Sequence, residues 1–452
     1  MADTLQQQNK PQICAEPTKS FFVEMLTRDI PLEQAVLDLV DNSVDGAKAM
    51  RPTGEQPFEG RQVDITFSQD GFRIVDNCGG FDSKAARDYA FRFGRPAGTP
   101  RTEHSIGQFG VGMKRALFKF GNHFVVRSAT TDDEWAVEVN VPEWESSSDG
   151  WYFPWAQFTP DENVSKARPG TDVFVDNLRP EVRTRFSTRL FENLIIGLIK
   201  SKHRQFISDG LSISVNGQHL DATNLYLLVR KDFQPGTDEI LFQDRGEDDV
   251  NVRIITGIGH SSPREAGWYV ICNGRVVLEA DRSSRTGWGL LEEQSDTIFM
   301  PSFHNQFARF RGIVSFDSKD SSRVPWNTTK TDVDHDNHVW QRTFGRMMEM
   351  MRPVISFLND LDNDIDEHTR EHSPLLDFVS NAESVKAERL PARAAFAAPA
   401  RGSIKKGQKT VKIQYSKPVD QVDFLMNELS VASAKAVGEK TFELIFQSMR
   451  DE

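Results

Sequence analysis

A carboxylate and a carboxamide lie one helical turn apart near the N-terminus, at Asp38 and Asn42. Residues four apart share a face of a helix, and Asp45 continues the same polar face. The amide oxygen of Asn42 suits Mg²⁺, a cation that prefers oxygen ligands and keeps several of its waters. From Asp38 a carboxylate could orient or deprotonate a water that attacks a terminal phosphate. Taken alone, the pair fits a solvated polar helix face better than a catalytic site.

A second candidate side chain directly follows a segment of alternating apolar residues, and two glycines come shortly after it. Asp76 comes two residues before Cys78, and Gly79 and Gly80 follow. A carboxylate can accept a hydrogen bond from the exocyclic amine of adenine, and glycines let a base approach the backbone. The same residues also suit a plain turn, so both interpretations stay open for this segment alone.

A glycine-rich loop, residues 106–113, runs into a helical pattern. Its glycines, Gly107, Gly110 and Gly112, allow backbone conformations that expose successive N–H groups to an anion, and the helix that follows presents its positive end. Lys114 could add a positive charge. The chain contains no G-x-x-x-x-G-K-[ST] sequence, so the loop differs from the common phosphate loop.

The periodicity of apolar residues places these groups on regular elements. Helices are expected over residues 31–50, 82–93, 112–120 and 181–207, and strands over 61–68, 71–76, 124–129, 135–141 and 171–176. Beyond residue 208 the pattern predicts strands over 211–215, 252–255 and 268–278, with a hairpin turn at Asn273 and Gly274, and then a helix over 339–361. Residues 386–417 hold nine Lys or Arg against one acidic residue, which indicates a flexible basic linker able to touch nucleic acid. An amphipathic segment, 422–449, ends the chain.

The bulk composition fits a soluble globular protein of two or three domains. The 452 residues exceed one ordinary core, and 38% hydrophobic with 27% charged residues is typical of globular proteins. The net charge of −12 leaves room only for a local nucleic-acid patch. Three scattered cysteines and a polar first stretch, residues 1–17, lead us to expect a cytoplasmic protein with no membrane partner.

Taken together and in this order, the three motifs resemble the GHKL ATP-binding superfamily. It includes gyrase B-type topoisomerases, ninety-kilodalton heat-shock chaperones, sensor histidine kinases, MutL-type repair proteins and MORC ATPases. The resemblance covers about residues 20–200, and residues 106–113 are most similar to the chaperone and MORC branches. Gly170 and Thr171 match a late Gly-Thr element of the family. The implied fold is of the α+β class. It begins with a Bergerat-type α/β sandwich (1–207) and a transducer-like α/β domain of the left-handed βαβ type (208–340). A helical segment (341–385), the linker (386–417) and a helical end (418–452) follow.

The resemblance also implies ATP and Mg²⁺ as cofactors and gives each residue a role. It assigns the metal to Asn42, water activation to Asp38, and adenine to Asp76 and Thr171. The remaining nucleotide-binding residues are Asp45, Gly80, Gly107, Gln108, Phe109, Gly110, Val111, Gly112 and Lys114. Two positions depart from the family pattern, because Asp38 stands where the catalytic Glu is usual and Cys78 replaces the first glycine of D-N-G-x-G.

A loop in the second domain adds a catalytic candidate. Residues 324–332 resemble the transducer loop that carries a lysine to the ATP γ-phosphate, and Lys330 occupies that place. A cation there would stabilise the charge of the transition state. A surface loop with one lysine is the alternative.

The expected function is an ATP-hydrolysing conformational switch that forms a homodimer on binding ATP·Mg²⁺. A MORC-like switch acting on DNA or another nucleic acid, in genome maintenance or antiviral defence, is one interpretation. A chaperone-like ATPase with a protein partner is a second, and a nucleotide-binding module with little turnover is a third. A histidine kinase is disfavoured, since no helical phospho-acceptor bundle precedes the ATP-binding motifs.

Overall fold

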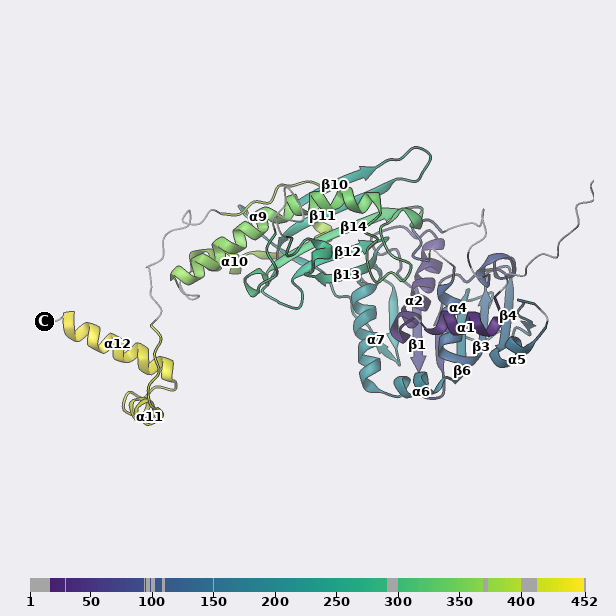
Figure 1. Cartoon of the computed structure of the whole chain (residues 1–452), viewed down its shortest axis with the longest axis horizontal. Coiled ribbons are helices and arrows are strands. Elements are labelled where there is room, and N and C mark those ends of the chain that lie inside the picture. The colour runs from purple at the N-terminus through teal and green to yellow at the C-terminus, as the bar shows by residue number, and fades with distance from the viewer. Residues whose placement is uncertain are drawn as a thin grey trace, which may run out of the picture. The chain divides into compact units, whose positions relative to one another are not determined.

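The computed structural model describes residues 17–28, 30–92, 94, 98, 102–107, 110–148, 150–290, 300–368, 373–399 and 413–450. The chain forms two compact units, one of Met1–Asp360 with Val379–Ala400 and one of Leu361–Phe378 with Arg401–Glu452. Both large sheets belong to the first unit (Figure 1). In the part of the chain that is described, no helix has the length and apolar character needed to cross a membrane.

The first sheet is mixed and carries the residues expected to bind adenine. Its strand order is β5-β4-β3-β6-β2-β1-β7-β8. The strands are β1 (Gln62–Phe67), β2 (Phe72–Asp76), β3 (Gly121–Ala129), β4 (Glu134–Asn140), β5 (Trp155–Ala156), β6 (Gly170–Leu178), β7 (Ser212–Val215) and β8 (Gln218–His219). Only β1 and β7 pair in parallel, and their pairing extends the sheet past the domain boundary expected at residue 207.

Three helices pack together beside this sheet. They are α1 (Lys19–Arg28), α2 (Leu32–Ala49) and α4 (Gly112–Phe120), and α4 contacts both α1 and α2 (Figure 1). On α2, Val36, Val40 and Val44 recur at helical spacing and are fully buried. Each such side chain contributes roughly 1.5–3 kcal/mol of burial free energy, which fixes the face of α2 that meets the core.

The expected long helix over 181–207 is instead three helices. They are α6 (Pro180–Phe186), α7 (Arg189–Lys202) and α8 (Arg204–Ser208). Thr188 caps α7 by accepting a hydrogen bond from the N–H of Phe191, and a hydroxyl that competes for backbone N–H groups favours a new helix start over continuation. The second break falls at His203, which is completely buried.

The expected helix over 82–93 is also irregular. Asp82 caps a short turn, α3 (Ser83–Ala85), and a π-helical turn over Ala86–Ala90 follows it. Such turns occur often at functional sites, because they free backbone carbonyls from the regular helical ladder.

The second sheet has the order β10-β11-β14-β12-β13 and lies in the same compact unit as the first. Its strands, the loops between them and the loop after β14 are called the second domain below. Its strands are β10 (Gly236–Phe242), β11 (Val250–Ile258), β12 (Gly267–Cys272), β13 (Arg275–Asp281) and β14 (Phe310–Ser318). Asn273 and Gly274 form the predicted hairpin turn, both with positive φ. The parallel strands β12 and β14 are connected through β13, and the described part of that connection contains no α-helix of the expected βαβ unit. Helix α9 (His338–His368) follows all five strands and bonds to the sheet, where its Met350 carbonyl accepts from Thr256.

The expected flexible linker is ordered over its first part. β15 (Glu383–Lys386) pairs with β9 (Tyr226–Val229), and Ala387 and Leu390 are buried in a cluster of apolar side chains from the second domain. Ala394 forms a backbone bridge further along. The prediction weighed the basic residues and missed the alternate apolar ones, which supply enough burial to hold this stretch. Residues 400–412 of the expected linker lie outside the described residues.

The second unit includes a pair of helices near the C-terminus. The expected single segment over 422–449 is divided into α11 (Val419–Glu428) and α12 (Ala434–Arg450), which pack on each other. Ser430 adopts a φ of 50° between them, and this left-handed conformation ends the first helix.

Candidate functional site

A cavity of about 1040 Å³ lies where α2, the segment after β2, the start of α4 and two loops of the second domain meet. It gathers nearly every residue that the sequence analysis selected. The described members that line it are Asp38, Asn42, Asp45, Asp76, Gly80, Gly107, Gly110, Val111, Gly112, Lys114, Thr171 and Lys330. Gln108 and Phe109 lie outside the described residues.

One end of the cavity is built around the Asp76 carboxylate. Its Oδ2 accepts a hydrogen bond from the Ser43 hydroxyl at 2.7 Å, and its Oδ1 accepts from the N–H groups of Cys78 at 2.9 Å and Thr171 at 3.2 Å. Each carboxylate oxygen accepts two hydrogen bonds, so Oδ2 retains capacity for an amine donor in the cavity. Burial raises the pKa of Asp76.

The glycines after Asp76 are needed for close packing of the backbone. Gly80 has a φ of 60°, and a Cβ there would lie 2.2 Å from the carbonyl oxygen of Ala129. Cys78, at the place of the missing family glycine, does not have a positive φ and is buried against Gly46. A side chain at residue 78 is therefore compatible with this loop.

The other end of the cavity is the glycine loop, which is tied to α2. The two oxygens of Asp45 accept from the N–H groups of Ile106 at 2.6 Å and Gly107 at 2.7 Å. Gly112 begins α4 close to α2, because a Cβ there would lie 3.1 Å from Oδ2 of Asp38. The N-terminal N–H groups of α4 have no partners within the helix, and they favour an anion such as a phosphate.

Lys114 lies on the wall of this end and is almost fully buried. Its ammonium donates a hydrogen bond of 2.6 Å to the Ala90 carbonyl in the π-helical turn. The charge is thus fixed in place beside the first turn of α4, where the sequence analysis expected it to face phosphate.

Asp38 and Asn42 lie between the two ends and differ in their surroundings. The Asp38 carboxylate is 1% exposed and accepts hydrogen bonds from Gln34 at 3.2 Å and Arg115 at 3.1 Å. The Asn42 side chain is exposed to the cavity and makes no hydrogen bond with any described residue. An open amide oxygen suits a Mg²⁺ ion that takes its other ligands from water and phosphate, so Asn42 fits the metal.

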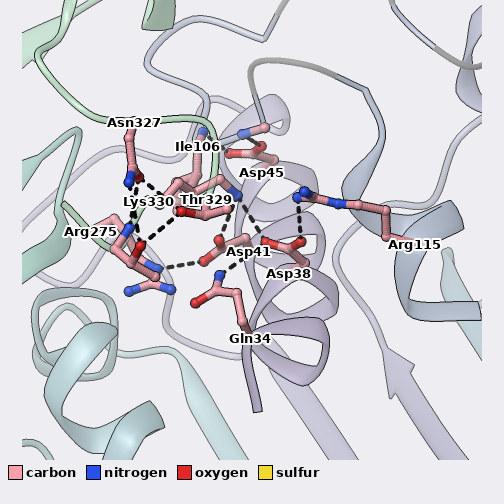
Figure 2. Close-up of polar contacts among 12 residues, drawn as sticks. Gln34, Asp38, Asp41, Asp45, Ile106, Arg115, Arg275, Asn327, Thr329 and Lys330 are labelled. Atoms are coloured by element: carbon pink, nitrogen blue, oxygen red, sulfur yellow. Dashed lines mark hydrogen bonds and ion pairs between the residues drawn. The ribbon is translucent and has the colours of Figure 1, made fainter. Parts of the chain in front are cut away.

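Lys330 reaches the cavity from the second domain and meets a buried carboxylate that the motifs did not assign (Figure 2). Its ammonium lies 2.7 Å from Oδ2 of Asp41 and 3.5 Å from Oδ1 of Asp38. Oδ1 of Asp41 accepts from Arg275 of β13 at 2.8 Å and from His203 at 2.8 Å. Burial alone would raise the pKa of Asp41, but Arg275, Lys330 and the bond from His203 hold it well below its usual range.

The loop that carries Lys330 is fixed by its own hydrogen bonds (Figure 2). The Asn327 side-chain oxygen accepts from the Thr329 hydroxyl at 3.1 Å and from the Thr331 N–H at 3.0 Å. Lys330 has a φ of 55°, which is uncommon for a residue other than glycine and occurs often at functional sites. Burial lowers the pKa of Lys330, and the stronger influence of Asp41 and Asp38 raises it, so the ammonium is charged.

Comparison with known proteins agrees with this geometry. Residues 30–171 match the family described as histidine kinase-, DNA gyrase B-, and HSP90-like ATPase. Residues 30–171 form a GHKL-type ATPase domain. The match begins just before α2 and ends at Thr171, so it spans the motifs from Asp38 to the adenine end of the cavity. No curated protein matches the chain.

The structure adds four functional candidates that the sequence motifs did not assign. They are Asp41, Arg115, His203 and Arg275. Arg115 lines the cavity and contacts Asp38, whereas His203 and Arg275 contact Asp41, and these three do not line the cavity. One signal for Asp41 was present in the sequence, because it shares the apolar face of α2 with Leu37 and Val44. A carboxylate on a buried face requires a charged partner. No comparable local pattern marks Arg115, His203 or Arg275.

The buried histidine of the ATPase domain should make folding depend on pH. Burial lowers the pKa of His203 from 6.5 to about 4. The unfolded chain therefore takes up a proton near pH 6.5 that the folded chain takes up only near pH 4, so stability is lost as pH falls between these values. Compared with His203→Gln, the wild type should lose about 3 kcal/mol of unfolding free energy between pH 7 and pH 4, measured by urea denaturation.

Asp209 provides a control of opposite sign for this experiment. Burial raises the pKa of Asp209 from 3.8 to about 6, so its contribution is present at low pH and is lost as pH rises from about 4 to 6. Compared with Asp209→Asn, the wild type should become less stable over that rise. A His203→Gln protein with the same pH dependence as the wild type would show that this histidine is not buried in the neutral form.

Proposed function

We propose that the chain is an ATP-hydrolysing conformational switch whose second domain senses the terminal phosphate. The observation that carries the proposal is the meeting of Lys330, from the second domain, with Asp38 of the ATPase domain at 3.5 Å inside one cavity. A cation and a carboxylate held together at the phosphate end can respectively stabilise transition-state charge and place a water.

Each lining residue has a task in the proposed reaction. Asp76 accepts a hydrogen bond from the adenine amine, and the backbone N–H groups at the start of α4 bind phosphate oxygens. Asn42 ligates Mg²⁺, which neutralises phosphate charge when bound. Asp38 orients the attacking water and accepts its proton, while Lys330 holds the γ-phosphate oxygens.

The proposed switch operates through association of two chains. ATP binding orders the cavity around the phosphates and favours a homodimer of ATPase domains, and hydrolysis releases it. We place nucleic acid first as the partner, in a MORC-like role in genome maintenance or antiviral defence. The basic residues between 386 and 417 support this choice, since they offer positive charge for phosphate contacts in an otherwise acidic protein.

Two measurements on the purified chain test this function. ATP turnover should depend on Mg²⁺, and light scattering should show dimer mass with a non-hydrolysable ATP analogue and monomer mass with ADP. Addition of duplex DNA should change the turnover rate. A chain that stays monomeric with the analogue would refute the dimerising switch, and turnover that is unaffected by any nucleic acid would favour a protein partner.

A nucleotide-binding module with little turnover is the second candidate. The observation in its favour is the double pairing of Asp38 with Arg115 at 3.1 Å and Lys330 at 3.5 Å. Carboxylate oxygens that are held by two cations are less available to a water molecule. Saturable ATP binding together with background hydrolysis would select this candidate.

A further inference from the structure

Asp41 is completely buried and does not line the cavity. It cannot touch a nucleotide there, yet it makes the shortest contact of the Lys330 ammonium, at 2.7 Å. Its role in the proposed reaction must therefore be exerted through Lys330.

The two oxygens of Asp41 hold two different parts of the second domain (Figure 2). Oδ1 accepts from Arg275 in β13, and Oδ2 accepts from Lys330 in the loop after β14. One carboxylate on α2 thus fixes both the strand and the lysine loop against the ATPase domain. Arg275 is completely buried, so this is an ion pair shielded from water.

The remaining capacity of the lysine points toward the cavity. An ammonium group has three N–H donors, and among the described residues Lys330 pairs with Asp41 and Asp38. Asp41 accepts one hydrogen bond from the ammonium and Asp38 lies 3.5 Å away as an ion-pair partner, so donor capacity is left for an oxygen in the cavity that Lys330 lines. Asp41 therefore orients the lysine without competing with an anion for every N–H.

We propose that Asp41 is a positioning residue that aims Lys330 at the terminal phosphate and so sets the preference for ATP over ADP. The proposal rests on the proposed function, in which Lys330 contacts the γ-phosphate. ADP lacks that phosphate, so loss of the aimed lysine weakens ATP binding and leaves ADP binding nearly unchanged. A carboxylate that merely stabilised the fold would affect both nucleotides alike.

The test is the ratio of the ADP and ATP-analogue dissociation constants, measured by calorimetry with Mg²⁺ on the full chain. The proteins are the wild type, Asp41→Asn, Lys330→Met and the double variant, which together form a double-mutant cycle. We expect each single variant to lower the preference for the ATP analogue at least tenfold, a change of about 1.4 kcal/mol. The double variant should be no worse than Lys330→Met, because Asp41 acts only through the lysine.

Two further variants serve as a matched control and as a replacement if Asp41→Asn does not fold. Asp281→Asn is a matched control, since Asp281 is a buried carboxylate of the second domain that pairs with Arg285 at 2.7 Å and does not line the cavity. It should keep the wild-type preference. If Asp41→Asn alone does not fold, Asp41→Asn with Arg275→Met removes the buried guanidinium together with its counter-charge, a replacement that is often tolerated.

The possible outcomes distinguish failure of the inference about Asp41 from failure of the proposed function. A folded Asp41 variant with the wild-type preference would overturn the inference, and so would effects of Asp41→Asn and Lys330→Met that multiply in the double variant. If Lys330→Met also keeps the preference for the ATP analogue, Lys330 does not contact the γ-phosphate, and the inference about Asp41 is refuted as well. A wild type that binds neither nucleotide would refute the proposed function as a whole.

Discussion

Replacing Lys330 by methionine should lower the rate of ATP hydrolysis by about 10²–10³-fold. The ammonium is buried beside Asp38 and Asp41 in a region where water screens charge poorly, so its stabilisation of a developing negative charge is large. ADP binding should change by less than about threefold, because the lysine acts on the phosphate that ADP lacks. Steady-state phosphate release and ADP calorimetry measure the two quantities.

Lys319→Met is the matched control for this prediction. Lys319 belongs to the same domain but is mostly exposed and pairs weakly with Glu103 at 3.6 Å. An exposed pair of this kind contributes little, so turnover should stay near the wild-type rate. Wild-type turnover in Lys330→Met would remove the lysine from the mechanism, and an equal loss of ADP binding would mean that the substitution disrupts the whole cavity.

Replacing Asp38 by asparagine should lower turnover by about 10²–10⁴-fold while ATP still binds. Asparagine keeps the size of the side chain and one oxygen for Gln34 and Arg115, but it cannot accept a proton from water. Bound ATP would then persist, and the dimer seen by light scattering should form with ATP itself as well as with the analogue. Single-turnover hydrolysis gives the chemical step directly.

Asp70→Asn, an exposed carboxylate at the turn between β1 and β2, serves as the control for Asp38. It should hydrolyse ATP at the wild-type rate. If Asp38→Asn does the same, another group activates the water and the carboxylate on α2 is structural. Turnover that is absent from the wild type and from both variants would leave the low-turnover binding module as the better function.

Local sequence was sufficient for the parts of the site that lie on one element or one turn. Asp38, Asn42 and Asp45 share a helix face because of their spacing, and α2 forms where the valine periodicity predicts it. Gly80 and Gly112 are glycines at points of close backbone approach. These features are set within a few residues, so a reader of the sequence can place them.

Contacts between residues that are far apart in the sequence could not be predicted from local patterns. Asp41 meets His203, Arg275 and Lys330 only because the junction of α7 and α8, strand β13 and the loop after β14 converge on α2. The apolar periodicity runs without interruption over residues 181–207, so it gave no sign of the helix break at His203. Residues between 386 and 397, which composition alone presented as part of a linker, likewise pair with β9 and with residues 234–237.

Equilibrium binding of a non-hydrolysable ATP analogue with Mg²⁺, to the wild type and to Asp76→Asn, tests the nucleotide site most directly. Asp76 accepts three hydrogen bonds from the protein and faces the cavity, and asparagine replaces one of its two acceptor oxygens with an NH2 donor that cannot accept from the adenine amine. The wild type should bind one analogue per chain, and Asp76→Asn should bind about 10–100-fold more weakly. No saturable binding by the wild type, or equal affinity in the two proteins, would contradict an ATP site in this cavity.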